Sequence, residues 1–380
     1  MDKIEELLTR GVANIIPNKE ELKKVLVSGK KLNVYLGIDP TSTKIHLGHA
    51  VVLKKLNEFA KLGHSVTFLI GDFTALIGDT SDKDKERPVL TPDEIQENFK
   101  TYKKQAEKIL DFSKIKVRYN SEWLDKLSSR ELIKLVQQFS FGDFSSRELI
   151  KKRLGEGKRV GMHESLYPAL QGYDSYFLDA DLQIGGTDQT FNMQAGRTLQ
   201  KIWRNKESFV LATEFLMGTD GRKMSKSWGN AIWLDDNPND MYIKIMAISD
   251  EYILNYFLLT TNLSIKEIKK YEKRLQSKEN PRDIKDALAR QIVSELHGNE
   301  LAKKVKLGGS IDIVFSTPDR RIFDILFEKG LVASRSEWKR LVEQKGVSVD
   351  HNIVKDPNAT IGNGKHIEVG PRKILKISTQ

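Results

Sequence analysis

Apolar residues in the first third of the chain occur as short continuous runs and as runs at helical spacing. After an N-terminal helical stretch, residues 32–38 and 65–70 are largely apolar and of strand length, and a third strand is expected at 115–119. Residues 47–62 place apolar side chains three and four positions apart, which predicts a helix between the first two strands. Because strands and helices alternate, we predict an α/β fold with a Rossmann-like parallel sheet covered on both faces.

The pattern changes twice farther along. From residue 237 to about 308 it is helical, and one helix is expected at 281–296, capped by Asn280. Beyond residue 318, two short amphipathic helices are mixed with two strand-like segments, at 322–329, 336–343, 347–349 and 366–369. We therefore expect an α/β domain at 1–230, a helical domain at 231–312 and a small α+β domain at 318–380.

The composition is typical of a folded cytoplasmic protein of two or three domains. Apolar residues make up 39% of the 380 positions, enough for a sizeable core. No apolar run approaches the roughly 18 residues that span a bilayer, and the polar, acidic start is unlike a secretory signal. With no cysteine, a disulfide framework and a thiolate zinc site are excluded, and no structural metal is expected. The formal charge of +10 favours a nucleic-acid partner only slightly.

His46-Leu47-Gly48-His49 follows the first predicted strand and enters the first predicted helix. In an open α/β sheet, that position is the crevice at the carboxyl ends of the strands, where ligands bind. Two histidines three positions apart lie on one side of a helix, and they add donors to a helix N-terminus that already suits anions. Structural histidines or a metal pair are the alternatives, although no cysteine or nearby carboxylate stands at ligand spacing.

Lys223-Met224-Ser225-Lys226-Ser227 lies far downstream, after the polar loop 218–222. Two lysines separated by small residues can swing onto a triphosphate as point charges. An isolated lysine pair in a loop is usually just solvated. Its pairing with a histidine motif at the mouth of the sheet is much more specific, and it predicts a phosphate site built from two distant segments.

The two motifs together resemble the signature sequences of class I aminoacyl-tRNA synthetases, and the second matches the family's commonest form at every position. The first motif has Leu47 where the family has Ile, which keeps an apolar residue of the same size. The resemblance covers nearly the whole chain and is closest to the bacterial, tyrosine-specific branch. It implies activation of L-tyrosine with ATP and Mg²⁺, transfer to tRNA(Tyr), and a homodimer. It also implies catalytic roles for His46, His49, Lys83, Arg87, Lys223 and Lys226.

The resemblance implies an amino-acid pocket on the sheet as well. Tyr167, Gln171 and Asp174 are four and three positions apart, so they share a helical face. By similarity, Asp174 and Tyr35 would hold the substrate phenol, while Tyr167, Gln171 and Asp79 would hold its ammonium group. A buried carboxylate can accept the phenolic proton, which phenylalanine lacks, and leaving that carboxylate unpaired is costly. By similarity, further contacts would go to tyrosine from Gln189 and to ATP from Gly37, Asp39, Gly48, Gly186, Asp188, Lys223 and Lys226.

Residues 318–376 resemble a small RNA-binding domain shared with a ribosomal small-subunit protein. Four basic residues are expected to face one phosphate groove, whereas Trp338 is expected in the core; the four are Arg335, Lys339, Arg340 and Lys345. A second basic stretch at 151–159 is either a solvated loop or a contact to the tRNA acceptor stem.

Three other interpretations remain open from the sequence. The chain could be specific for tryptophan, could adenylylate a small metabolite without tRNA, or could be a non-enzymatic RNA-binding or splicing factor derived from a synthetase. The C-terminal RNA-binding pattern argues against the first two. The intact histidine and lysine motifs, together with Asp174, argue against the third.

Overall fold

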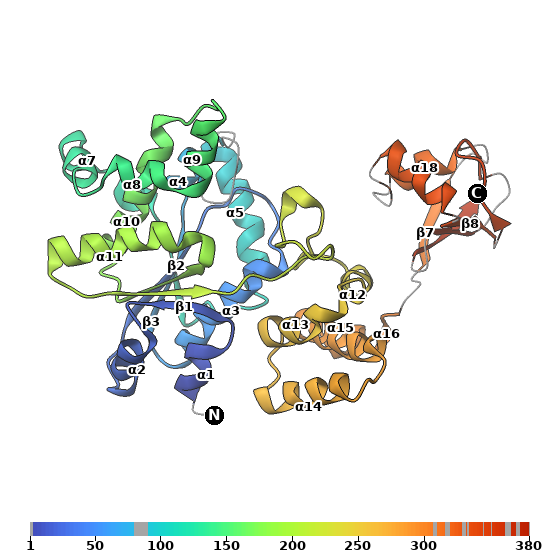
Figure 1. The fold of residues 1–380 in the computed structure, drawn as a ribbon, viewed down its shortest axis with the longest axis horizontal. Helices are drawn as coiled ribbons and strands as arrows, with labels where there is room; N and C mark the ends of the chain where they lie inside the picture. The colour runs from blue at the N-terminus through green and yellow to red at the C-terminus, as the bar shows by residue number, and fades with distance from the viewer. Residues whose placement is uncertain are drawn as a thin grey trace. The chain divides into compact units, whose positions relative to one another are not determined.

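Figure 1 shows the fold of the 380-residue chain as a computed structural model. The structure describes residues 3–79, 90–306, 310–315, 320–328, 332, 334–344, 346–350, 352–361, 366–369 and 373–379. The chain divides into two compact units, one of residues 1–236 and 248–284 and the other of residues 237–247 and 285–380. No helix in the described part of the chain is long and apolar enough to cross a membrane.

The first unit contains a six-stranded sheet with the strand order β1-β6-β5-β2-β3-β4. Its strands are β1 (Val12–Ile16), β2 (Asn33–Ile38), β3 (Ser65–Ile70), β4 (Ile115–Tyr119), β5 (Leu182–Gly186) and β6 (Phe209–Thr213). Neighbours are parallel except that β1 pairs antiparallel with β6 at one edge. The three strands predicted from the sequence are confirmed, but β1 lies in the segment predicted to be helical. Only Ile15 of β1 is buried, so this short edge strand leaves no strand-like alternation in the sequence.

Two crossovers place helices on opposite faces of this sheet. β2 leads through α3 (Leu47–Lys61) to β3, and β5 leads through α11 (Thr190–Arg204) to β6. These steps run in opposite directions along the sheet. Since such crossovers are right-handed, α3 and α11 lie on opposite faces, and the strand order reverses between β2 and β5.

The first unit contains further helical elements besides α3 and α11 (Figure 1). They are α1 (Lys3–Thr9), α2 (Lys19–Val27), α4 (Thr74–Ile77), α5 (Pro92–Ala106), α6 (Ser121–Leu124), α7 (Ser129–Val136), α8 (Phe141–Ser146), α9 (Glu148–Gly155), η1 (Met162–Leu166), α10 (Tyr167–Phe177), η2 (Thr187–Gln189), η3 (Lys226–Trp228), η4 (Asp250–Tyr252), α13 (Ile253–Thr260) and α14 (Ile265–Gln276). α10 packs closely on α11, because a Cβ on Gly172 would lie only 3.0 Å from the backbone of Ala195. This close approach fixes the helix on which Tyr167, Gln171 and Asp174 lie.

The second unit holds α12 (Pro238–Met246), most of α15 (Pro281–His297), α16 (Asn299–Lys304) and a small α+β region. Asn280 caps α15 as predicted, since its side chain accepts a hydrogen bond from the Arg282 N–H at 3.1 Å. The α+β region has α17 (Ile322–Glu328) and α18 (Arg335–Glu343) with a sheet in the order β7-β11-β10-β8-β9. Its strands are β7 (Ser310–Phe315), β8 (Val347–Val349), β9 (Asn352–Ile353), β10 (His366–Val369) and β11 (Lys373–Thr379). Trp338 lies in the core of this region, as predicted, and its indole N–H donates to the Pro357 carbonyl at 2.7 Å.

Candidate active site

A cavity of about 550 Å³ lies at the carboxyl ends of β2 and β5, where the strand order reverses. Most of the residues predicted from the sequence line this one cavity: Tyr35, Gly37, Asp39, His46, Gly48, His49, Asp79, Tyr167, Gln171, Asp174, Gly186, Asp188, Gln189 and Lys223. Lys226 is not one of its lining residues, and Lys83 and Arg87 lie outside the described residues. The sheet therefore brings together residues that are more than 180 positions apart in the chain.

The two histidines stack on each other at the start of α3. His46 is the N-cap, and its backbone N–H donates to Nδ1 of His49 at 3.2 Å. The centres of the two rings lie 3.8 Å apart. Gly48 leaves room for the His46 ring, because a Cβ at position 48 would lie only 2.9 Å from His46 Nδ1. Burial, together with His49 and Lys223, holds the pKa of His46 well below its ordinary value. His46 is therefore neutral near pH 7, and its buried Nδ1 has no hydrogen-bond partner among the described residues.

The two signature motifs meet at one wall of the cavity. The Leu47 N–H donates to the Ile232 carbonyl at 2.8 Å, which ties the start of α3 to the chain just after the lysine motif. A Cβ on Gly48 would lie 3.8 Å from the Cβ of Met224, so the helix start and the lysine segment are in van der Waals reach. The spacing of the two motifs does not predict this contact, because His49 and Lys223 are 174 positions apart in the chain.

The lysine segment is held in a defined backbone conformation. Nζ of Lys223 lies 3.0 Å from Oδ2 of Asp188 and 4.1 Å from the centre of the Phe215 ring. The buried Asn230 side chain donates to the Lys223 carbonyl at 3.1 Å and accepts from the Ser225 N–H at 2.9 Å. The side chain of Lys226, at the start of η3, is exposed. One lysine is thus placed in the cavity wall, and the other faces solvent.

A buried carboxylate lies in another part of the same cavity. Asp174 is 3% exposed, and it accepts hydrogen bonds from Nε1 of Trp123 at 2.8 Å and Nδ2 of Asn120 at 3.1 Å. Burial raises the pKa of Asp174 to about 8, although these two donors act in the opposite direction. Tyr35, also buried, donates its hydroxyl proton to Oε1 of Gln183 at 2.7 Å. Burial and the nearby Asp174 raise the pKa of Tyr35, so this phenol keeps its proton.

Two further carboxylates are fixed by neutral donors. Asp39 accepts from the Tyr167 hydroxyl at 2.9 Å and from the Thr74 hydroxyl at 2.8 Å. Asp79 accepts from Nε2 of Gln189 at 2.6 Å. These neutral donors hold both carboxylates in the cavity wall, where a carboxylate oxygen can accept from an ammonium group or a hydroxyl of a ligand.

Five residues that shape this site were not predicted: Thr74, Asn120, Trp123, Gln183 and Asn192. Asn192 donates from its Nδ2 to Asp79 at 3.4 Å. Two of the five carry a signal in the sequence, since Asn120 directly follows β4 and Gln183 is a polar residue within the apolar β5. Trp123 carries none, because nothing local shows that an indole N–H meets a carboxylate 51 positions away.

In the second unit, three of the four basic residues predicted to contact RNA lie exposed on α18. They are Arg335, Lys339 and Arg340, whereas Lys345 lies outside the described residues. The guanidinium of Arg335 lies 5.6 Å from the centre of the Phe323 ring. The helix turns Trp338 into the core and leaves these cations at the surface.

Comparison with known proteins agrees with this architecture. A family described as class I tRNA synthetases (W and Y) matches residues 28–308, and an S4 domain matches residues 320–367. The tyrosine–tRNA ligase of Thermotoga maritima is 41% identical over 388 residues, with 98% of this chain and 96% of the relative covered. That of Carboxydothermus hydrogenoformans is 41% identical over 397 residues, with 98% and 97% covered. The tyrosyl-tRNA synthetase of Archaeoglobus fulgidus, solved in complex with L-tyrosine, is 25% identical with a TM-score of 0.62, over 80% of this chain and 99% of that one.

The sheet, the paired motifs and these matches define a class I aminoacyl-tRNA synthetase of the tryptophan and tyrosine group. The similarity extends over nearly the full length of relatives with a single specificity. The chain belongs to the tyrosine–tRNA ligases.

Proposed function

We propose that the 550 Å³ cavity is where this ligase forms tyrosyl-adenylate, with Asp174 at the substrate phenol and the paired motifs at the phosphates of ATP. The observation that carries the proposal is the contact between the start of α3 and Met224, in the wall of the cavity that also contains Asp174. One cavity thereby offers both an acceptor for a phenol and donors for a triphosphate.

Asp174 and Tyr35 would hold the phenol of the substrate. The two donors from Trp123 and Asn120 leave Asp174 with lone pairs that can accept the phenolic proton. Tyr167, Gln171 and Asp79 would hold the ammonium group. Because the Tyr167 hydroxyl gives its own proton to Asp39, its oxygen faces a ligand as an acceptor, as an ammonium group requires. Further contact to tyrosine would come from Gln189.

ATP would lie against the glycines and the paired motifs. A Cβ on Gly186 would lie 2.5 Å from Oδ1 of Asp188, so glycine lets this carboxylate fold back beside the strand end, where we place the ribose. Lys223 would leave Asp188 for the phosphates, and Lys226 would reach them from its exposed position. The remaining nucleotide contacts are assigned to Gly37, Asp39 and Gly48, with Lys83 and Arg87 on pyrophosphate.

In the first step an oxygen of the tyrosine carboxylate bonds to the α-phosphorus, and the bond from that phosphorus to the bridging oxygen breaks as pyrophosphate leaves with the electron pair. The attacking carboxylate is already ionised near pH 7, so no general base is needed. Catalysis would come from positioning and from charge stabilisation by His46, His49 and the lysines. Mg²⁺ would enter with the triphosphate as part of the substrate.

ATP–pyrophosphate exchange with each of the twenty amino acids tests the activity, and charging of total tRNA tests the second step. We expect a signal with tyrosine, and a signal with tryptophan alone would contradict the pocket assignment. Lys226→Ala is expected to slow tyrosine-dependent exchange by about 10²-fold or more. Lys303→Ala, which removes an exposed lysine paired with Glu300, is the matched control. Exchange by Lys226→Ala within about twofold of wild type would contradict the role of the lysine loop.

We further propose that residues 1–230 are catalytic, 231–312 lie toward the anticodon side and 318–380 bind RNA. In the second step, a hydroxyl of the terminal adenosine of tRNA(Tyr) attacks the carbonyl carbon of tyrosyl-adenylate. The bond from that carbon to the phosphate oxygen breaks, AMP leaves with the electron pair, and the hydroxyl proton is released. We place this reaction in the cytoplasm, where charged tRNA is used. Arg335, Lys339, Arg340 and Lys345 would contact phosphates. Lys339→Ala should raise the KM for tRNA and flatten its salt dependence by about one charge while exchange stays unchanged. An unchanged KM would remove Lys339 from the interface.

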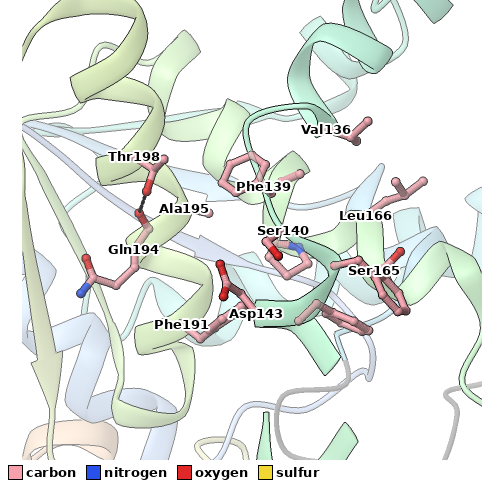
Figure 2. Close-up of a pocket in the computed structure, with 14 residues that line it drawn as sticks. Val136, Phe139, Ser140, Asp143, Ser165, Leu166, Phe191, Gln194, Ala195 and Thr198 are labelled. Carbon is pink, nitrogen blue, oxygen red and sulfur yellow. Dashed lines mark hydrogen bonds between the residues drawn. The ribbon is translucent and has the colours of Figure 1, made fainter. Parts of the chain in front are cut away.

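We also propose a homodimer through the connecting region between β4 and β5. Large apolar side chains are exposed there, notably Ile133, Phe141 and Met162. Beside them lies a largely apolar groove of about 310 Å³, and Figure 2 shows Phe139, Leu166 and Phe191 around it. A second copy would cover this surface. Sedimentation of the wild type as a monomer at micromolar concentration would contradict the dimer, and Met162→Lys is expected to shift the protein toward monomer.

A further inference from the structure

The segment that leads into Lys223 is a small hairpin, and its geometry decides where that lysine lies. Met217 and Lys223 face each other in an antiparallel bridge, and the Gly218 N–H donates to the Arg222 carbonyl at 2.7 Å. The turn is made at Gly221, whose φ is +80°. Because Met217 is opposite Lys223, a displacement of one moves the backbone of the other.

Helical elements from beyond the sheet hold this hairpin at both ends. Tyr256 on α13 is fully buried, and its hydroxyl donates to the Met217 carbonyl at 2.5 Å. Tyr252 at the end of η4 donates to the Gly221 carbonyl at 3.3 Å. Burial raises the pKa of Tyr256, so its hydroxyl remains a donor at any pH at which the enzyme works. One tyrosine thus holds the base of the hairpin and the other holds its tip.

α13 is itself fixed to the frame that carries the histidines. The Arg10 guanidinium donates to the carbonyls of Leu258 and Thr261, each at 2.8 Å, at the C-terminal end of α13. Lys54 of α3 donates to the Thr260 carbonyl. Two cations at the end of a helix satisfy its last carbonyls and interact favourably with its dipole. Since His46 caps α3 and His49 lies in its first turn, the same helix holds the histidines at one end and contacts α13 farther along.

We propose that Tyr256, assisted by Tyr252, is a positioning residue that sets Lys223 against the phosphates for adenylate formation. The inference rests on the proposed contact between Lys223 and ATP. Neither tyrosine lines the cavity, so neither touches substrate, and each acts through the hairpin backbone. The sheet and α13, rather than the loop sequence alone, then determine the distance between the two halves of the phosphate site.

Tyr256→Phe tests this, because it removes the hydroxyl and keeps the ring. We expect kcat for tyrosine-dependent pyrophosphate exchange to fall about tenfold, while the affinity for tyrosine stays within about twofold. Tyr242→Phe is the matched control, since this buried hydroxyl in the second unit donates to Asp286 Oδ1 at the same distance of 2.5 Å. If Tyr242→Phe slows exchange as much as Tyr256→Phe does, a general loss of stability explains both effects, and the inference is overturned.

A double variant separates this inference from the proposed function. If Tyr256 acts through Lys223, then Tyr256→Phe combined with Lys223→Ala is no slower than Lys223→Ala alone. Effects that multiply would overturn the positioning role while leaving the role of Lys223 in place. A Lys223→Ala variant with wild-type exchange would instead contradict the proposed function. If Tyr256→Phe does not fold, the same double-mutant cycle is measured with Tyr252→Phe and judged by the same criterion. We expect Tyr252→Phe to lower kcat for exchange about threefold.

Discussion

The proposed contact between Asp174 and the substrate phenol predicts that the affinity for tyrosine depends on pH. Its pKa, raised to about 8 by burial, means that the carboxyl group gains its proton as the pH falls through the neutral range. If the phenol of tyrosine donates to the ionised carboxylate, then protonation of Asp174 competes with substrate binding. Asp174→Asn removes the titration and keeps the size of the side chain, so the variant isolates this effect.

The magnitude follows from the ionised fraction. With a pKa of about 8, the carboxylate is about three-quarters ionised at pH 8.5 and only about 3% ionised at pH 6.5. The affinity for tyrosine should therefore weaken about 25-fold from pH 8.5 to pH 6.5. Phenylalanine has no proton to donate and leaves the charged carboxylate unpaired, so its rejection should relax as the pH falls.

The raised pKa of Asp174 also determines how the stability of the protein depends on pH. The folded protein holds a proton on Asp174 between about pH 4 and pH 8, where the unfolded chain has lost it. The contribution of Asp174 to the free energy of unfolding therefore falls as the pH rises through that window. In Asp174→Asn this contribution is absent, so the stability of the wild type relative to the variant should fall as the pH rises through that window.

Equilibrium dialysis of labelled tyrosine without ATP, from pH 6.5 to 8.5, measures the binding effect directly. The wild type should lose affinity toward low pH, and Asp174→Asn should bind weakly at every pH. A wild-type affinity that stays constant within about twofold would refute the argument, since the carboxylate would then not titrate in this range or would not meet the phenol.

Three other perturbations test the packing around the site. Gly71→Ala would put a Cβ 2.0 Å from Oδ1 of Asp39, so kcat/KM in pyrophosphate exchange should fall about tenfold or more with an unchanged circular dichroism spectrum. Arg153 is 1% exposed, and its guanidinium is paired with Glu164 at 2.6 Å. Glu164→Ala would leave this buried charge without its carboxylate, so the free energy of unfolding measured with urea should fall by about 3–5 kcal/mol. A fall of less than about 1 kcal/mol would contradict the importance of this pair. Asn230→Ala should lower kcat for exchange about tenfold and leave tyrosine affinity intact, because it frees the backbone of the lysine segment.

Periodicity predicted the parts of the fold that have a strong local signal. The buried strands β2 and β3 are continuous apolar runs, and α15 begins directly after its predicted cap, Asn280. The missed β1 has the opposite character, because its sheet position depends on pairing with β6 almost two hundred residues away. Strand order is likewise absent from local sequence, although it decides where the crevice forms.

The candidate site likewise contains residues that the sequence predicts and residues that it does not. Short motifs predicted His46, His49 and Lys223, and all three residues line the cavity. The neutral donors to Asp174 lie more than fifty positions before it, since Asn120 follows β4 and Trp123 belongs to α6. A hydrogen bond between side chains distant in the sequence leaves no periodic pattern, so the sequence does not predict these two donors.

His46 could bind phosphate either as a neutral hydrogen-bonding group or as a charged imidazolium, and the two differ in their dependence on pH. Burial, together with His49 and Lys223, keeps the pKa of His46 well below its ordinary value, so this ring acts as a neutral hydrogen-bonding group beside a charged lysine. At saturating tyrosine, which keeps Asp174 occupied, kcat/KM for MgATP should then vary by less than about twofold between pH 7 and 8.5. A requirement for a charged histidine of ordinary pKa would instead produce a fall of about 20-fold over that range. His46→Gln, which keeps a neutral polar side chain, should retain more exchange activity than His46→Ala. A steep decline of the wild type with pH, or equal activity of the two variants, would contradict this role.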